Sequence, residues 1–210
     1  MIKTVNIYAC FSNKIHFIED CGIKPSAIVG GGAVTPYSLP WQVALVRPGS
    51  DRPFCGGILI SERHVLTAAH CTSGTINVIV GEHSVTSSSD GTRHTICRYR
   101  DHPSYGNLNY DYAILHLNSP VTLGARAVPA CLPPTTMNDA FLGGKTLTVS
   151  GWGALTQGGG SPTVLHSVDV PGMTNAQCNQ NYPGDIGPSE LCAGQPSGGI
   201  DSCQGDSGGE

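Results

Sequence analysis

The sequence predicts an all-β protein, a barrel or a sandwich built from short antiparallel strands. Short apolar segments alternate with turn residues along most of the chain, and 28 glycines and 15 prolines among the 210 residues supply the turns. Helical character is confined to one stretch, Thr174–Asn179, which Thr174 would cap at its N-terminus. An all-β protein of this length can form a single unit with a sizeable core.

The strand signal begins at Trp41–Val46. Trp41, Val43 and Leu45 fall on one face because side chains alternate along a strand, and a Pro-Gly turn ends the segment. Another apolar strand leads into Thr67. The remaining predicted strands are equally short and bounded by turn residues: Phe54–Ile60, Ile76–Val80, Thr95–Arg100, Ala113–Leu117, Leu147–Ser150 and Val164–Val170.

Composition excludes several classes of protein. Charged residues make up 12 % of the chain, the formal net charge is −4, and there is no Lys/Arg run, which argues against a nucleic-acid partner. No stretch approaches the roughly 20 apolar residues that a membrane span needs. Nine cysteines occur without a Cys-x-x-Cys pair, so disulfides in a secreted protein are favoured over metal binding. The odd number leaves at least one cysteine unpaired within the chain.

Three segments carry residues suited to nucleophilic catalysis. His70 follows an apolar strand, Asp111 opens another, and Ser207 lies in a glycine-rich segment near the end of the sequence. A serine hydroxyl is a weak nucleophile near pH 7, so it needs a base, and histidine is the side chain that titrates closest to neutrality. A carboxylate would orient the imidazole. The open backbone N–H groups of Gly205 and Ser207 would stabilise a developing oxyanion.

These segments resemble the trypsin/chymotrypsin family of serine endopeptidases. The likeness extends from Ile28 to Gly209 and includes the chain order His, Asp, Ser. A single Gly-Asp-Ser-Gly-Gly cluster is more often an ordinary turn, but three motifs in this order favour the protease. Other shared motifs are Ile28-Val-Gly-Gly31, Pro40-Trp41, Cys55-Gly-Gly57 and Gly151-Trp-Gly153.

The resemblance implies two antiparallel six-stranded β-barrels with the active site between them. Residues 1–27 would be leader and propeptide. Residues 28–129 would form the first barrel, with His70 and Asp111, and residues 130–210 a partial second barrel. Because the chain stops at Glu210, where the family continues, we expect a C-terminally truncated sequence whose second barrel cannot close and which is inactive as written.

By resemblance, Ser207 attacks the substrate carbonyl, His70 transfers the proton, and Asp111 orients the imidazole. Gly205 and Ser207 would form the oxyanion hole. Asp201 matches the residue at the base of the specificity pocket, which implies cleavage of peptide bonds after Arg or Lys through an acyl-enzyme. The alternative is a catalytically silent homologue that acts as a binding module.

Activation would follow the family's zymogen switch, in which the new α-amino group of Ile28 pairs with Asp206. Ala27 precedes Ile28, whereas a precursor cut by trypsin would have Arg or Lys there, so we expect a different activating protease. Met1–Phe11 is a poor match to a signal peptide, although the family and the cysteines predict a secreted protein.

The family pattern also pairs cysteines. It implies the bonds Cys55–Cys71 and Cys178–Cys192, and a chymotrypsinogen-like link between Cys21 and Cys131. Cys97 has no family partner, and Cys10 lies in the predicted leader. The partner of Cys203 would lie beyond Glu210 in the family.

We expect no cofactor and no metal. Gly81-Glu82-His83 resembles the start of the calcium loop of vertebrate trypsins, but Ser89 and Thr92 stand where further carboxylates would be needed. Asp90 is the only other acid nearby.

The expected partners are protein and peptide substrates and protein protease inhibitors. Nucleic acid and membranes are not expected, and the protein is predicted to be a monomer. Arg93, Arg98 and Arg100 form a small basic patch that we interpret as a solvated strand face rather than an exosite.

Overall fold

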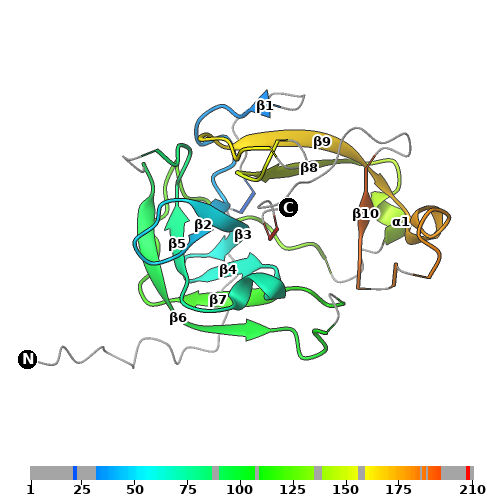
Figure 1. Cartoon of the computed structure of the whole chain (residues 1–210), viewed down its shortest axis with the longest axis horizontal. Coiled ribbons are helices and arrows are strands. Elements are labelled where there is room, and N and C mark those ends of the chain that lie inside the picture. The colour runs from blue at the N-terminus through cyan, green and yellow to red at the C-terminus, as the bar shows by residue number, and fades with distance from the viewer. Residues whose placement is uncertain are drawn as a thin grey trace, which may run out of the picture.

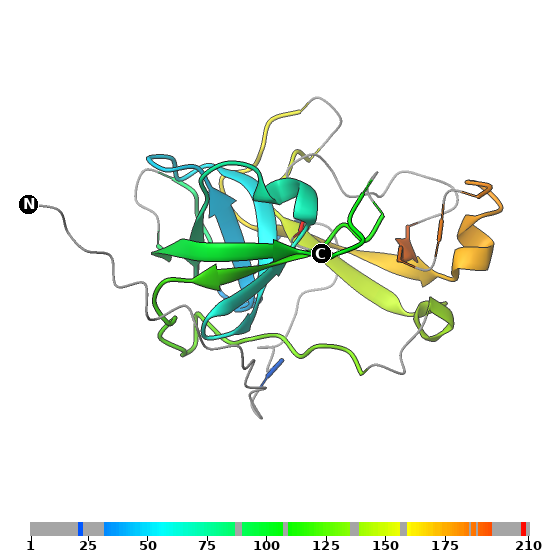
Figure 2. The same cartoon turned by 90° about the horizontal axis from the view of Figure 1, so that it is seen from below.

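The protein consists of a closed β-barrel and a second antiparallel sheet that lies beside it (Figures 1 and 2). This is a computed structural model, and the all-β prediction is confirmed. The structure describes residues 21–22, 32–86, 90–106, 109–134, 139–155, 159–184, 186–187, 189–194 and 207–208.

The first barrel closes in the order β2-β3-β4-β7-β6-β5, and every neighbouring pair is antiparallel. Its strands are β2 (Gln42–Val46), β3 (Pro53–Ser61), β4 (His64–Thr67), β5 (Asn77–Val80), β6 (Thr92–Asp101) and β7 (Ala113–Leu117). Closure leaves no free strand edge in this barrel, which removes the usual liability of exposed backbone hydrogen-bonding groups.

Strand β2 contributes side chains to two hydrophobic clusters. All five of its residues are buried. Val43 and Leu45 pack inside the barrel, whereas Ala44 and Val46 pack outside it, because successive side chains point to opposite faces. The outer cluster also contains Val34, Leu39, Ile79, Trp152 and Leu165. Since Trp152 and Leu165 belong to the second half of the chain, this cluster joins the two halves.

The second sheet is built around β9 (His166–Met173). Its other strands are β1 (Gly32–Ala33), β8 (Thr146–Gly151) and β10 (Cys192–Ala193), each antiparallel to β9. The chain just before β2 therefore belongs to this sheet through β1.

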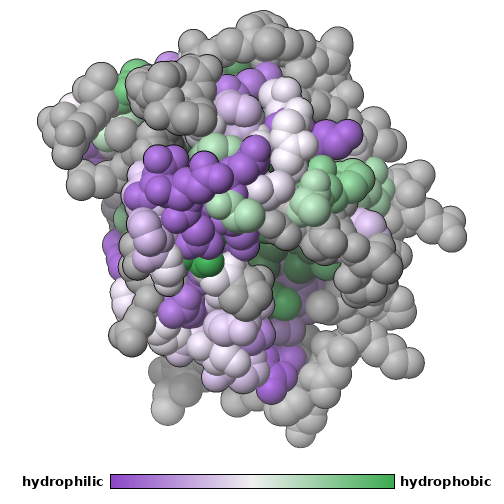
Figure 3. Space-filling view, turned by 90° about the vertical axis from the view of Figure 1, so that its right-hand side faces the viewer, coloured by the Kyte–Doolittle hydropathy of each residue, from purple (hydrophilic) through white to green (hydrophobic). Residues whose placement is uncertain are grey.

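Three short helices complete the described part of the chain: η2 (Ala69–Thr72), α1 (Asp139–Leu142) and α2 (Asn175–Cys178). Thr174 caps α2 as predicted: its Oγ1 accepts from Gln177 N at 3.2 Å, and Gln177 Oε1 accepts from Thr174 N at 3.0 Å. The end that carries α1, α2 and β10 presents apolar as well as polar side chains (Figure 3), with Phe141 and Leu191 among the exposed ones. No helix within the described ranges is long and apolar enough to cross a membrane.

Disulfides join Cys21 to Cys131, Cys55 to Cys71, and Cys178 to Cys192. These are the three pairs that the resemblance implied. Cys97 in β6, for which the family pattern implied no partner, is disulfide-bonded as well. Cys10 and Cys203 lie outside the described residues.

Candidate active site

His70 is presented by a short, tethered segment. Strand β4 ends at Thr67, and the chain turns at once into η2, which contains His70. The next residue, Cys71, is bonded to Cys55 in β3, and Thr72 Oγ1 contacts Ala69 O at 2.8 Å and Asp101 Oδ1 at 3.1 Å. These tethers leave the segment little freedom, while the imidazole itself stays 39 % exposed.

Asp111 holds His70 at two points. Its Oδ2 lies 2.6 Å from His70 Nδ1, and its Oδ1 accepts from the backbone N–H of His70 at 2.8 Å. The pairing of Thr67 with Ala113 between β4 and β7 places the two residues side by side. Because the carboxylate accepts the proton of Nδ1, the neutral ring keeps its lone pair on Nε2, the nitrogen that a base would use.

A tight turn at Tyr110–Tyr112 positions Asp111. Tyr110 has a φ of 53°, a left-handed conformation that non-glycine residues seldom adopt. Its ring stacks on His102 with centroids 4.8 Å apart, and its carbonyl accepts from Tyr112 N at 2.8 Å. Strained backbone of this kind is concentrated at functional sites.

The Ser207–Gly208 dipeptide sits against the first barrel. Ser207 O accepts from Gly56 N at 2.8 Å and lies 3.8 Å from Cys71 Sγ, next to His70 in the chain. Gly208 has a φ of +80°, and a Cβ there would lie 2.7 Å from Gly56 O and would overlap Thr67 Oγ1. Only glycine therefore fits at position 208. The contacts of Ser207 O with Gly56 and Cys71 bring Ser207 into the neighbourhood of His70 and Asp111.

Four predicted site residues lie outside the described residues: Ile28, Asp201, Gly205 and Asp206. The oxyanion hole, the specificity pocket and the activation pair therefore stay predictions. Sequence reasoning missed two positioning residues that the structure reveals. Thr67, whose Oγ1 donates to Gly56 O at 2.8 Å, ends a predicted apolar strand, but Tyr110 gave no signal because tyrosine is not typical of a left-handed turn.

Among the described residues, one group of side chains is close enough to suggest a metal site. The ligand atoms of Cys55, His70 and Cys71 lie within 4.8 Å of one another. The two sulfurs form a disulfide, so they cannot serve as thiolate ligands.

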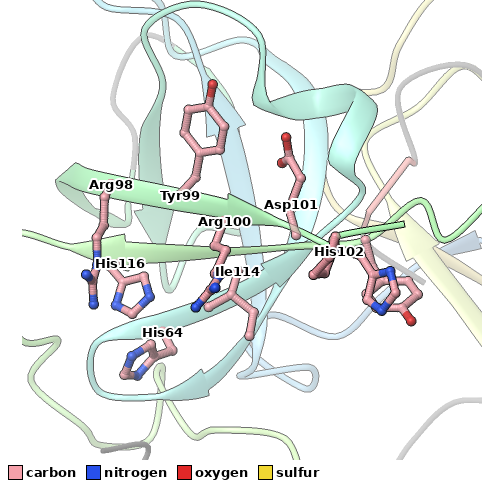
Figure 4. Close-up of a pocket in the computed structure, with 11 residues that line it drawn as sticks. His64, Arg98, Tyr99, Arg100, Asp101, His102, Ile114 and His116 are labelled. Carbon is pink, nitrogen blue, oxygen red and sulfur yellow. The ribbon is translucent and has the colours of Figure 1, made fainter. Parts of the chain in front are cut away.

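A cavity of about 620 Å³ lies along β4, β7 and β6, and its lining includes His64, Arg98 and His116 but neither His70 nor Asp111 (Figure 4). His64, His116 and Arg98 form a row across the three strands, and Arg100 pairs with Ile114 in the next row. Arg93 lies outside these rows and forms an ion pair with Asp51. The predicted basic patch is therefore two separate features.

The two histidines of this row contact each other edge to face, with ring centroids 4.5 Å apart. Burial lowers the pKa of His116 to about 4, and the neighbouring His64 and Arg98 add to the effect. Burial also lowers the pKa of His64, whose Nδ1 lies 2.7 Å from Ser61 Oγ, and Arg98 and Arg63 lower it further.

We predict that stability falls as the pH drops from about 6.5 to about 4. In this window His116 is protonated in the unfolded chain but neutral in the folded protein, so protonation favours unfolding. Replacing the imidazole in His116→Gln should flatten the slope of unfolding free energy against pH, measured by urea titration. Arg93→Gln, on the same strand but outside the cavity, should leave the slope unchanged. A slope that is the same in His116→Gln as in the wild type would contradict this account.

Comparison with known proteins agrees with the geometry. The Trypsin family model matches residues 28–209. Serine protease 1 of Rattus norvegicus is 41 % identical over 187 residues, which covers 87 % of this chain and 73 % of the relative. Trypsin of Xenopus laevis is 39 % identical over 188 residues, covering 87 % of this chain and 74 % of the relative.

The solved structure of neuropsin, a serine protease expressed in the limbic system of mouse brain, superposes with a TM-score of 0.74 at 34 % identity. The superposition covers 87 % of this chain and 81 % of the neuropsin chain. The chain belongs to the trypsin family. It is thus a trypsin-like serine hydrolase, and its closed six-stranded barrel with an incomplete second barrel is the fold that the resemblance predicted.

Proposed function

We propose that this protein is a secreted serine endopeptidase precursor that hydrolyses peptide bonds after Arg or Lys. The observation that carries the proposal is the two-point hydrogen bonding of Asp111 to His70, at 2.6 and 2.8 Å, beside the seat of Ser207. A base oriented by a carboxylate and placed next to a serine is the arrangement that acyl transfer needs.

In the proposed reaction, Ser207 Oγ forms a bond to the scissile carbonyl carbon while His70 Nε2 takes the hydroxyl proton. The oxygen of the tetrahedral intermediate becomes negative, and the N–H groups of Gly205 and Ser207 stabilise it. The C–N bond then breaks, and the leaving amine takes the proton from His70. Water repeats the sequence on the acyl-enzyme, with His70 again as the base and Asp111 stabilising the imidazolium.

Specificity would come from Asp201. A carboxylate buried at the base of the pocket pairs with a cationic side chain, and its desolvation penalises neutral substrates. Such substrates are segments of proteins and peptides, and protein protease inhibitors would occupy the same cleft.

The precursor state would depend on Ile28 and Asp206. Cleavage after Ala27 creates an ammonium group that did not exist before, and its pairing with the Asp206 carboxylate would order the oxyanion loop. The Cys21–Cys131 disulfide would keep the N-terminal piece attached after this cleavage, since it joins the chain on both sides of the cut.

We predict that an organophosphonate covalently labels the activated full-length protein and that Ser207→Ala abolishes the labelling, because the reagent reacts with an activated serine hydroxyl. Mass spectrometry of the labelled peptide reads out the result. Ser161→Ala, which removes an exposed serine from a loop of the second half, should label like the wild type. Absence of labelling in the wild type would instead favour a catalytically silent homologue that acts as a binding module.

We predict that Asp201→Ser lowers kcat/KM for Arg and Lys substrates by roughly a hundredfold or more, because a buried substrate cation would lose its charged partner. Hydrolysis of a matched substrate with a neutral side chain should change far less. Asp169→Ser, which alters a half-buried carboxylate on β9, serves as the control. An unchanged preference for Arg and Lys in Asp201→Ser would refute the assignment of the pocket.

A further inference from the structure

The loop between β5 and β6 contains the sequence that resembles the start of a calcium loop. Calcium takes six to eight oxygen ligands, usually with several carboxylates among them. The described residues of this loop bring two acids together, Glu82 and Asp90. The question is whether their oxygen atoms are free to bind a divalent cation.

Both oxygens of Asp90 are already engaged by donors of the protein. Tyr37 OH donates to Oδ2 at 2.6 Å, and the backbone N–H groups of His83 and Ser84 donate to Oδ1 at 2.9 and 3.3 Å. Burial would raise the pKa of Asp90, but its hydrogen bonds with His83, Tyr37, Ser84 and Glu82 outweigh this effect, and the pKa is lowered. The carboxylate is therefore stabilised in its charged form without a metal ion.

A cation of the protein itself lies at this site. The guanidinium carbon of Arg126 lies 4.2 Å from the centroid of the Tyr37 ring, and Arg126 Nη1 donates to Asp90 O at 3.3 Å. Tyr37 reaches this position from a left-handed backbone conformation, with a φ of 62°. Arg126 thus places its positive charge over the Tyr37 ring and at the backbone carbonyl of Asp90.

Two backbone carbonyl oxygens in the described part of the loop also have partners. His83 O accepts from Leu165 N at 2.9 Å and from Trp152 Nε1 at 3.2 Å, and Asp90 O accepts from Arg126. Within the described part of the loop, the Asp90 carboxylate and the carbonyls of His83 and Asp90 all have protein partners, and these groups do not form an open ligand set for a calcium ion.

These contacts connect parts of the chain that are far apart in sequence. Tyr37 follows β1, Asp90 precedes β6 of the first barrel, and Arg126 lies in the connection between the two halves. His83 continues the chain of hydrogen bonds to Leu165 at the start of the second sheet. The path from Tyr37 through Asp90 and His83 therefore runs from one half of the molecule to the other.

We propose that Tyr37, His83, Asp90 and Arg126 form an interbarrel clasp that takes the place of a bound calcium ion. The guanidinium of Arg126 supplies the positive charge, and the Tyr37 hydroxyl and the loop amides supply the ligands of the Asp90 carboxylate. The clasp fixes the placement of the second sheet against the first barrel, where His70 and Asp111 lie. The contacts of the clasp do not depend on which residue is the nucleophile.

The first test is the melting temperature of the wild-type full chain, recorded in EDTA and in millimolar CaCl₂. The clasp predicts the same melting temperature in both, and no heat of Ca²⁺ binding in a calorimetric titration. A ligand that binds only the folded state raises its stability by mass action, so a higher melting temperature in Ca²⁺ would overturn the proposal.

The second test is Tyr37→Phe, which keeps the ring and removes the hydroxyl that Asp90 accepts from. Loss of a hydrogen bond to a charged group should lower the melting temperature by about 3–10 °C. The matched control is Tyr182→Phe, because the Tyr182 side chain is 58 % exposed, and it should leave the melting temperature unchanged. Equal melting temperatures for the two variants would overturn the clasp. Neither test uses an activity readout, so their failure is distinguishable from failure of the proposed function.

Discussion

The two hydrogen bonds that Asp111 accepts from His70 are the interaction on which the candidate site depends. They exist because β4 and β7 are paired in one register, Thr67 opposite Ala113, in a barrel that closes. A slip of one residue would turn every side chain of a strand to the opposite face, so the core that fixes the register also fixes the site. Leu115, fully buried in β7, and Val65, fully buried in β4, belong to that core.

The second half of the molecule is held against this barrel by apolar and polar contacts together. Strand β2 gives alternate side chains to the barrel interior and to the cluster around Trp152 and Leu165. The proposed clasp adds hydrogen bonds that reach the same two residues through His83 O. Both contacts are connected to Ser207 indirectly. Ser207 is hydrogen-bonded to Gly56 in β3, and β3 pairs with β2. Burial supplies most of the stability, and the directional bonds define the placement.

The sequence predicted the periodic and motif-based features well. Alternating apolar residues located the longer strands, and the Thr174 cap located α2. It could not predict β1 or β10, because a strand of two residues has no periodicity. The contact between Tyr37 and Asp90 spans 53 residues and uses a tyrosine in a left-handed conformation, and neither property is visible in a local pattern. Family resemblance likewise gave no indication that Cys97 is bonded.

The orientation of His70 by Asp111 is tested most directly by the activity of Asp111→Asn in the activated full-length protein. An amide at this position can donate to the ring nitrogen, which would favour the wrong tautomer of His70, while the shape of the side chain is kept. The account predicts that kcat falls by about 10⁴-fold, the effect of this change in a serine–histidine–aspartate triad, with the melting temperature nearly unchanged. A kcat within tenfold of the wild type would show that the orientation of His70 by Asp111 does not carry the reaction.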